Sequence, residues 1–102
     1  MRYLPTVAVF SWLVARASFY APNPRHLKMW GTQNVTVHRI LKSGTKLEVV
    51  NLRNGKRVLV TVLGWRPAKW TKRDLDLSRH SFRAIELPSR GVAWVRYRVV
   101  GK

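Results

Sequence analysis

The stretch SGTKLEVVNLRNGKRVLVTV, residues 43–62, decides the fold of this chain. Its two halves alternate apolar and polar side chains, a period of two that is typical of half-buried β-strands. The apolar residues that share a face are Leu47 and Val49 in the first half and Val58, Val60 and Val62 in the second. Between the halves lies Asn54-Gly55, a pair that favours the positive φ angles of a two-residue type I′ turn. The stretch therefore predicts an antiparallel β-hairpin.

Weaker signals on both sides of the hairpin predict further strands and one helix. Residues 17–20 and 35–40 are rich in β-forming side chains, and residues 92–100 alternate between apolar side chains and arginines. A helical spacing of apolar residues follows Asp76, and Pro88 and Gly91 predict where that helix ends. We expect a single domain with five or six strands and one short helix.

The first seventeen residues, MRYLPTVAVFSWLVARA, allow two interpretations. An early arginine, an apolar stretch and small residues at positions 15 and 17 fit a signal peptide that is cleaved before Ser18. The β-forming run at residues 6–10 fits an extra N-terminal strand that is retained. The apolar stretch is too short to cross a bilayer as a helix, so we expect no integral membrane span. The domain proper is expected over residues 18–102. Cleavage predicts a secreted, periplasmic or envelope location, and retention predicts a cytoplasmic or virion-associated one.

Charge is the most unusual bulk property of the chain. Its 102 residues include 20 lysines and arginines but only four acids, a formal net charge of +16. Such a surface attracts polyanions, and its binding weakens as salt is added. Nucleic acid, anionic lipid headgroups and anionic wall polymers are all candidates, and charge does not choose among them. The chain has no cysteine, and its three histidines lack the spacing of metal ligands, so we expect neither metal nor cofactor.

Five landmarks, in order, resemble the RlpA (rare lipoprotein A) type of domain, which is related to expansins and barwin-like domains. They are ASFY at 17–20, VHRIL with SGT at 37–45, VNLRNGK at 50–56, LDLS at 75–78, and Ser81-Phe82 with Ile85. The resemblance implies a mostly β fold: a small six-stranded double-psi β-barrel with one or two short helices. It also implies a protein that interacts with cell-wall glycan, peptidoglycan above all.

The resemblance implies two catalytic residues. Asp76 matches the acid of expansins and family-45 endoglucanases, and His38 matches a histidine proposed to assist catalysis. One interpretation places Asp76 in a groove opposite His38. The other makes the Asp76 carboxylate the N-cap of the following helix, where backbone N–H groups and the helix dipole favour it.

Two acids of the family pattern have no counterpart in this chain. The aspartate expected after the second hairpin strand is replaced around Gly64, where the run LGWRP keeps only the proline. The glutamate expected before the histidine is also missing, because no acid precedes Glu48. A lytic transglycosylase can use the sugar's own 6-hydroxyl in place of water, so one acid could suffice. Enzyme activity therefore stays open, between a weak lytic transglycosylase and a catalytically degenerate binder.

Further candidate glycan-binding side chains lie near these positions. They are Tyr20, Trp65, Arg66, Trp70 and Asp74. Flat indole rings stack on sugar faces, and they stack equally well on nucleic-acid bases. A ring of the tryptophan-rich loop could instead plug the barrel end, and Trp30 and Trp94 are expected in the core or at the barrel rim.

Because the chain is basic and indole rings stack on bases, the alternative function is a basic nucleic-acid-binding module, or a structural component of a larger particle such as a virion. The sequence leaves the oligomeric state open.

Overall fold

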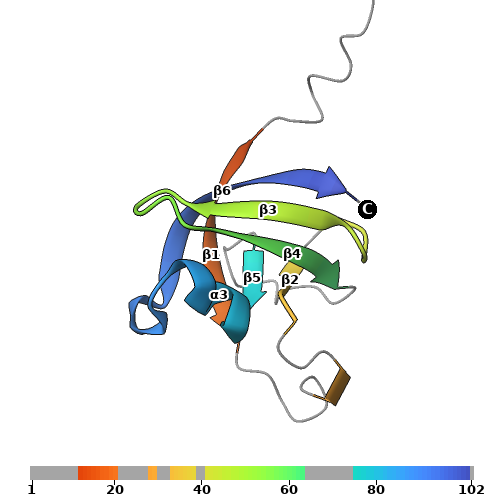
Figure 1. The fold of residues 1–102 in the computed structure, drawn as a ribbon, viewed down its shortest axis with the longest axis horizontal. Helices are drawn as coiled ribbons and strands as arrows, with labels where there is room; N and C mark the ends of the chain where they lie inside the picture. Colours follow the sequence, from red (N-terminus) through yellow and green to blue (C-terminus); the bar gives the residue numbers. More distant parts are fainter. Residues whose placement is uncertain (1–11, 21–27, 30–32, 39–40, 64–74, 102) are drawn as a thin grey trace, which may run out of the picture.

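Six strands close into a barrel in the computed structural model of the chain, which describes residues 12–20, 28–29, 33–38, 41–63 and 75–101 (Figure 1). The strands are β1 (Leu13–Tyr20), β2 (Val35–His38), β3 (Lys46–Asn51), β4 (Arg57–Leu63), β5 (Leu75–Ser78) and β6 (Val92–Gly101). Around the barrel their order is β1-β5-β2-β4-β3-β6. The mostly β, six-stranded barrel predicted from the sequence is confirmed.

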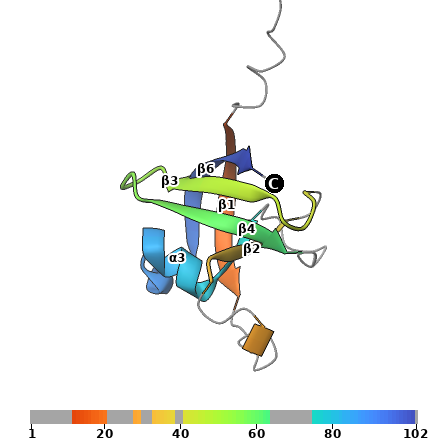
Figure 2. The same ribbon diagram turned by 45° about the vertical axis from the view of Figure 1, so that its right-hand side comes forward.

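Two of the strand pairs are parallel and join segments that are distant in the sequence. β1 pairs in parallel with β5, and β2 pairs in parallel with β4. The remaining four pairs are antiparallel, and the long strands β3 and β6 run side by side in both ribbon views (Figures 1 and 2). Closure gives each strand a neighbour on both sides, so the barrel has no open sheet edge.

The β3–β4 hairpin forms as predicted, but its turn is longer than the predicted two residues. Asn51 N–H donates to the Lys56 carbonyl oxygen at 2.8 Å, which leaves residues 52–55 as the loop. Gly55 N–H donates back to the Asn51 carbonyl oxygen, and Gly55 takes a φ of 74° that favours glycine. The type I′ prediction was therefore wrong. The Asn51 side chain accepts a hydrogen bond from the Arg53 N–H at 2.9 Å and so stabilises the longer loop.

Apolar side chains from all parts of the barrel fill its interior. The core contains Ala15, Ala17, Leu47, Val49, Val58, Val60, Val62, Leu75, Leu77, Phe82, Ile85, Ala93, Val95 and Tyr97. The helix α3 (Arg79–Ile85) contacts β1, β4 and β5 and lies against one end of the barrel in both ribbon views. Phe82 and Ile85 bury their side chains from this helix. A 3₁₀ turn, η1 (Pro88–Arg90), leads into β6.

The N-cap of α3 is Ser78, not Asp76. The Ser78 hydroxyl accepts the Ser81 N–H at 3.3 Å. Asp76 lies two residues earlier, within β5, because LDLS continues the sheet as a strand. The capping interpretation of Asp76 is therefore wrong, because its carboxylate lies on a strand and not at the start of the helix.

The structure also bears on the predictions for Trp94 and for the N-terminal segment. Trp94 was expected in the core or at the rim, but it lies 59% exposed on the outer face of β6. β1 begins at Leu13, and residues 13–17 of this strand pair with β6 in the barrel.

The predicted strand at 6–10 and Trp30 lie outside the described residues. Among the described residues, none of the helices has the length and apolar character needed to cross a membrane.

Candidate functional site

Asp76 occupies the centre of a three-stranded part of the barrel, between β1 and β2. Its register partners are Ser18 on β1 and Val37 on β2. Ser18 Oγ donates a hydrogen bond to Asp76 Oδ1 at 3.0 Å. The flanking residues Leu75 and Leu77 are fully buried in the core, so Asp76 faces the opposite, outer side of the sheet. The structure therefore places a half-buried carboxylate on the outer face of the barrel, oriented by a hydroxyl.

Tyr20 completes a small polar cluster with Ser18 and Asp76. It follows Ser18 by two residues on β1, so both side chains lie on the same face of the strand. Burial of the phenol and, to a smaller extent, the negative charge of Asp76 together raise the pKa of Tyr20 to about 12. The Tyr20 hydroxyl is thus a neutral hydrogen-bond donor at physiological pH. A carboxylate beside two hydroxyls is a set of groups that exchanges hydrogen bonds with sugar hydroxyls.

His38 lies on the other side of the sheet from Asp76. Its register partner is the core residue Leu75, and its imidazole is buried. The Leu41 N–H donates to Nδ1 at 3.2 Å, and Nε2 lies 3.2 Å from the Tyr97 hydroxyl. Because Nδ1 accepts, the neutral ring carries its proton on Nε2. The groove with Asp76 opposite His38 is therefore not formed, since neighbouring register positions of a sheet point to opposite faces.

Both glutamates of the described residues, Glu48 and Glu86, are held in ion pairs. Glu48 accepts from Arg57 at 2.7 Å and from Arg98 at 2.9 Å. Arg57 lies on β4 and Arg98 on β6, the two strands beside β3. The Glu48 ion pairs therefore hold these three strands together. The described part of the chain contains no cluster of three or more acidic, histidine or cysteine side chains that could hold a metal ion.

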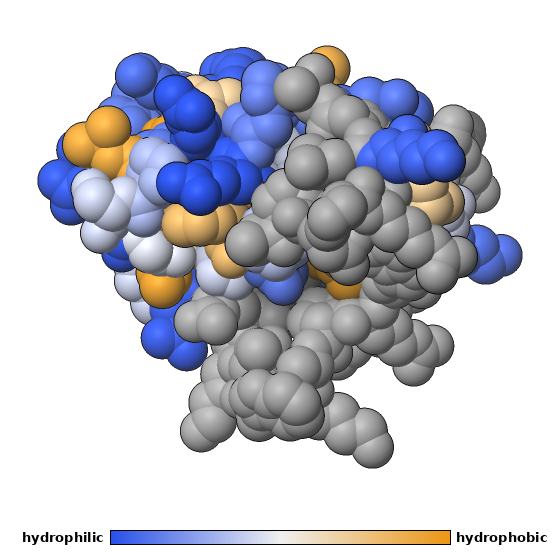
Figure 3. Space-filling view, turned by 90° about the horizontal axis from the view of Figure 1, so that it is seen from below, coloured by the Kyte–Doolittle hydropathy of each residue, from blue (hydrophilic) through white to orange (hydrophobic). Residues whose placement is uncertain are grey.

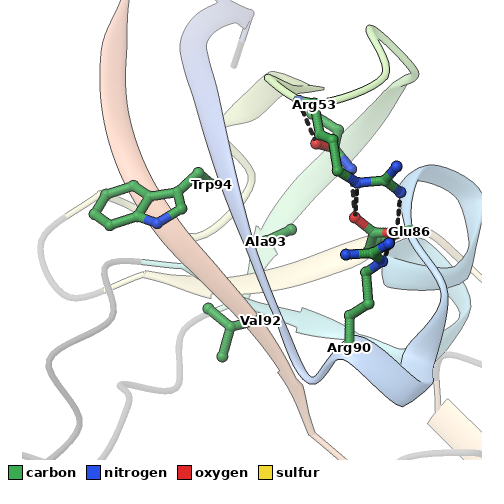
Figure 4. Close-up of a pocket in the computed structure, with 7 residues that line it drawn as sticks. Arg53, Glu86, Arg90, Val92, Ala93 and Trp94 are labelled. Atoms are coloured by element: carbon green, nitrogen blue, oxygen red, sulfur yellow. Dashed lines mark hydrogen bonds and ion pairs between the residues drawn. The ribbon is translucent and has the colours of Figure 1, made fainter.

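Glu86 is the second paired carboxylate, and its side chain is only 3% exposed (Figure 4). It accepts from Arg53 at 2.6 Å, and Arg90 lies 3.4 Å away. The Arg53 hydrogen bond is the main cause that lowers the pKa of Glu86 to about 2. The Asn51 side-chain amide also belongs to this cluster. It donates hydrogen bonds to Glu86 Oε2 at 3.1 Å and to the Ile85 carbonyl oxygen at 2.8 Å. A hollow adjoins the cluster, but its acid is already neutralised, so we assign the cluster a structural role.

Two residues of these networks were not among the predicted site residues. Ser18 was noted only within the ASFY landmark and as a possible mature start, and Tyr97 only as one of the alternating residues of the strand at 92–100. The predicted site residues that lie outside the described part of the chain are Trp65, Arg66, Trp70 and Asp74, together with the Gly64 region. Of the predicted residues that are described, the structure brings Tyr20 and Asp76 together and places His38 apart.

The comparison with curated proteins finds sequence similarity over about two thirds of the chain. No protein-family model matches the chain. A segment of 66 residues, 64% of the chain, is 39% identical to the probable endolytic peptidoglycan transglycosylase RlpA of Nostoc sp.. The chain spans only 17% of the length of that protein.

Solved structures share the fold over most of the chain. The Streptomyces papain inhibitor matches with a TM-score of 0.67 at 16% identity, over 90% of this chain and 96% of the inhibitor. An expansin of Clavibacter michiganensis matches with a TM-score of 0.62 at 20% identity, over 88% of this chain and 50% of the expansin. A mutant of that expansin in complex with cellohexaose matches with a TM-score of 0.61 at 18% identity, with the same coverage. The chain is thus a double-psi β-barrel that resembles RlpA in sequence and expansin in fold, as its landmarks predicted.

Proposed function

We propose that the chain binds cell-wall glycan, peptidoglycan in particular, through the outer face that carries Asp76, Ser18 and Tyr20. The observation that carries this proposal is the half-buried Asp76 carboxylate, which Ser18 holds at 3.0 Å next to the neutral Tyr20 hydroxyl. Sugars present many hydroxyl groups, and a carboxylate accepts from them while a phenol donates. The sequence similarity to an RlpA and the shared fold with an expansin solved with cellohexaose support the same ligand class. The implied location is the cell envelope or the extracellular space.

Binding is proposed as the main activity, with slow lytic transglycosylase chemistry at most. Glycosidic cleavage generally uses one acid that protonates the leaving oxygen and a second group that stabilises the sugar cation. Glu48 and Glu86 are engaged by arginines, and the acid expected near Gly64 is absent from the sequence. Loss of one general acid–base group costs about 10²–10⁴-fold in rate. In the remaining chemistry the protonated form of Asp76 would give its proton to the glycosidic oxygen as the C1–O bond breaks. The resulting carboxylate would take the proton of the sugar's own 6-hydroxyl as O6 bonds to C1, which closes the product ring and restores the acid.

Side chains outside the described residues extend this proposal. The segment between β4 and β5 in the sequence contains the candidates Trp65, Arg66, Trp70 and Asp74. We propose that they add stacking and polar contacts to the same glycan. Single alanine substitutions at Trp65 and Trp70 test this extension, since a ring that stacks on a sugar should contribute measurably to affinity.

The experiment that tests the proposed function uses purified peptidoglycan sacculi. The chain is incubated with sacculi and pelleted, and the soluble fraction is analysed for anhydromuropeptides by mass spectrometry. We expect the wild-type chain to pellet with sacculi and Asp76→Asn to bind more weakly. Any anhydromuropeptide release should disappear in Asp76→Asn.

Glu86→Gln is the matched control, because it removes the same charge from an ion pair with Arg53 that lies outside the proposed site. Thermal unfolding of each variant checks that the barrel is folded. Equal pelleting of wild type and Asp76→Asn, or an equal loss in Glu86→Gln, would contradict the proposed site.

A further inference from the structure

Arginine and tryptophan side chains alternate on the outer face of the β1–β6 pair. We call this set the Arg/Trp ladder; its members are Trp12, Arg16, Trp94, Arg96 and Arg98. None of them belongs to the cluster around Asp76. The ladder therefore requires its own explanation.

The register between the two strands places these side chains on one face. Trp94 pairs with Arg16, and Arg96 pairs with Val14. The residues between them, Ala93 and Val95, are buried in the core, so the even-numbered residues of β6 point outward. Figure 4 shows the same alternation: the Trp94 ring extends over β1, on the side of β6 away from the Glu86 cluster.

The rings and the guanidinium groups are stacked on one another. The guanidinium carbon of Arg96 lies 4.2 Å from the centre of the Trp12 ring, and that of Arg98 lies 4.6 Å from it. The guanidinium carbon of Arg16 lies 5.8 Å from the Trp94 ring centre. These distances are within the range of cation–π contacts. Stacking restricts the arginines before any ligand arrives, which reduces the entropy lost on binding.

The charge of the ladder is only partly neutralised by the protein. Arg98 shares Glu48 with Arg57. Within the described residues, neither Arg16 nor Arg96 forms an ion pair with a carboxylate. The Trp94 ring is 59% exposed, and Val14 beside it is also exposed. Beyond its cation–π contacts, this face thus combines positive charge that no described carboxylate neutralises with exposed flat apolar surface, a combination that marks interaction sites.

The chain as a whole is basic. Seen from below, the coloured part of the surface is mainly hydrophilic, with apolar residues scattered on it (Figure 3). A generally positive surface explains a weak attraction to any polyanion. It does not explain why two indole rings are interleaved with three arginines in register.

We infer that the Arg/Trp ladder binds an anionic glycan, meaning a sugar chain whose units carry carboxylate or phosphate groups. An indole ring packs against the apolar face of a sugar. A guanidinium that is stacked on a ring still presents its N–H edge, which pairs with carboxylate or phosphate in a bidentate manner. A ligand that offers both a flat sugar face and an anionic substituent satisfies both kinds of group. This inference rests on the proposed function for the class of ligand, and it names a second contact surface for it.

The ladder and the Asp76 site are continuous along one strand. The ladder residue Trp12 immediately precedes β1, and the ladder residue Arg16 lies on β1. Ser18 and Tyr20 continue the same outer face to Asp76. At about 3.3 Å per residue, the ladder extends roughly 13 Å from Trp12 to Arg16, and Ser18 follows about 7 Å further along β1. This is long enough for a few sugar units.

The two ends of this surface differ in charge, and that difference selects the ligand. The Asp76 carboxylate disfavours a phosphate or carboxylate at its own position, whereas the ladder favours one. A nucleic-acid strand carries a phosphate at every nucleotide, so it would place negative charge against Asp76. A glycan with anionic groups on only some of its sugars avoids this conflict. The observations therefore favour the glycan over single-stranded nucleic acid.

The test compares two double variants with the same net charge. Arg16→Gln with Arg96→Gln removes two ladder charges, and Lys56→Gln with Arg83→Gln removes two exposed charges on the hairpin tip and on α3. Affinities are measured for polygalacturonate, a wall teichoic acid, neutral cellohexaose and a short oligothymidylate. We expect the ladder variant to lose about tenfold or more in affinity for at least one anionic glycan, because charge-assisted hydrogen bonds are lost. The control variant should lose little. Trp94→Ala should weaken the same ligand.

The two anionic glycans distinguish carboxylate from phosphate recognition, and either result supports the inference. Equal losses in both double variants would show attraction to net charge alone and would overturn it. Tighter binding of oligothymidylate than of either glycan, with the same dependence on Arg96, would identify a nucleic-acid site and would also overturn it.

Asp76→Asn, measured alongside, separates this inference from the proposed function. If sacculus binding survives in Asp76→Asn but is lost in the ladder variant, the Asp76 site fails and the ladder stands. If the ladder variant binds like wild type while Asp76→Asn does not, the ladder fails and the Asp76 site stands.

Discussion

Ser18 and Asp76 are joined in two ways: they are register partners between β1 and β5, and the serine hydroxyl donates to the carboxylate at 3.0 Å. The pairing is parallel and links residues that are 58 positions apart in the chain. It fixes the direction of the carboxylate on the outer face of the barrel. A side chain that had no predicted function thereby positions the proposed sugar-binding acid.

Ser18→Ala tests this positioning role. Removal of the hydroxyl leaves the Asp76 carboxylate in place but less well oriented, so we expect sacculus affinity to fall about fivefold, the equivalent of roughly 1 kcal/mol for one hydrogen bond. The loss should be smaller than in Asp76→Asn. Ser18→Thr keeps the hydroxyl and should restore most of the affinity in the same pelleting assay. An equal loss in the alanine and threonine variants would point to packing and not to the hydrogen bond.

The ionisation of Tyr20 provides an independent probe of the same cluster. Because burial and the Asp76 charge both disfavour the phenolate, the pKa of Tyr20 lies at about 12, above the ordinary 10.0. In Asp76→Asn the charge contribution disappears, and the pKa should fall but stay above the ordinary value. Ultraviolet titration of the tyrosines measures this, with Tyr20→Phe identifying the relevant transition. An unchanged pKa in Asp76→Asn would show that the two groups do not interact.

Glu86 should make folding stability depend on acid pH. Its pKa is lowered from 4.5 to about 2, first by the Arg53 hydrogen bond and also by the Leu87 N–H and the Asn51 amide. A lowered pKa stabilises the folded state above the unfolded pKa, and this contribution is lost as pH falls from about 4.5 towards 2. Glu86→Gln should therefore have a lower Tm than wild type at pH 7, and the two Tm values should converge near pH 2. Parallel melting curves at all pH values would contradict this.

Asn51 links the hairpin to the end of α3 and should be important for stability. Its buried amide donates to Ile85 O and Glu86 Oε2, and its oxygen accepts the Arg53 N–H. Asn51→Ala leaves buried groups without partners, so we expect a loss of about 1–3 kcal/mol in the free energy of unfolding. Urea denaturation measures the loss, and Asn54→Ala, at an exposed position of the same loop, should cost less. An unchanged urea midpoint in Asn51→Ala would exclude this role.

A truncation tests what the barrel needs from its first strand. Residues 13–17 pair with β6, and Ala15 and Ala17 lie in the core. A chain that begins at Ser18 lacks these contacts, and we expect it to unfold or to melt at a much lower temperature than a chain that begins at Trp12. Near-ultraviolet circular dichroism and thermal melts compare the two. Equal stability would make a mature start at Ser18 compatible with the fold.

Local patterns identified most of the β-structure. The alternation around Leu47 and Val60 predicted the hairpin, the alternation around Tyr97 predicted β6, and the ordered landmarks predicted the barrel. These signals depend on residues that are close in sequence, because side chains of one strand alternate with a period of two wherever the strand lies. The predictions of a two-residue turn and of Asp76 as the helix cap were wrong, because side-chain hydrogen bonds of Asn51 and Ser78 decide these two features.

The sequence by itself determined the strands, the basic charge and the importance of Asp76 as a candidate. Only the tertiary structure decided that Ser18 and Tyr20 flank Asp76, that His38 faces the core, and that Trp94 stacks with Arg16 on the outside. The physical reason is register. A shift of one residue between two strands moves every side chain to the other face, and the register of strands far apart in the chain is set by closure of the barrel, not by any local pattern.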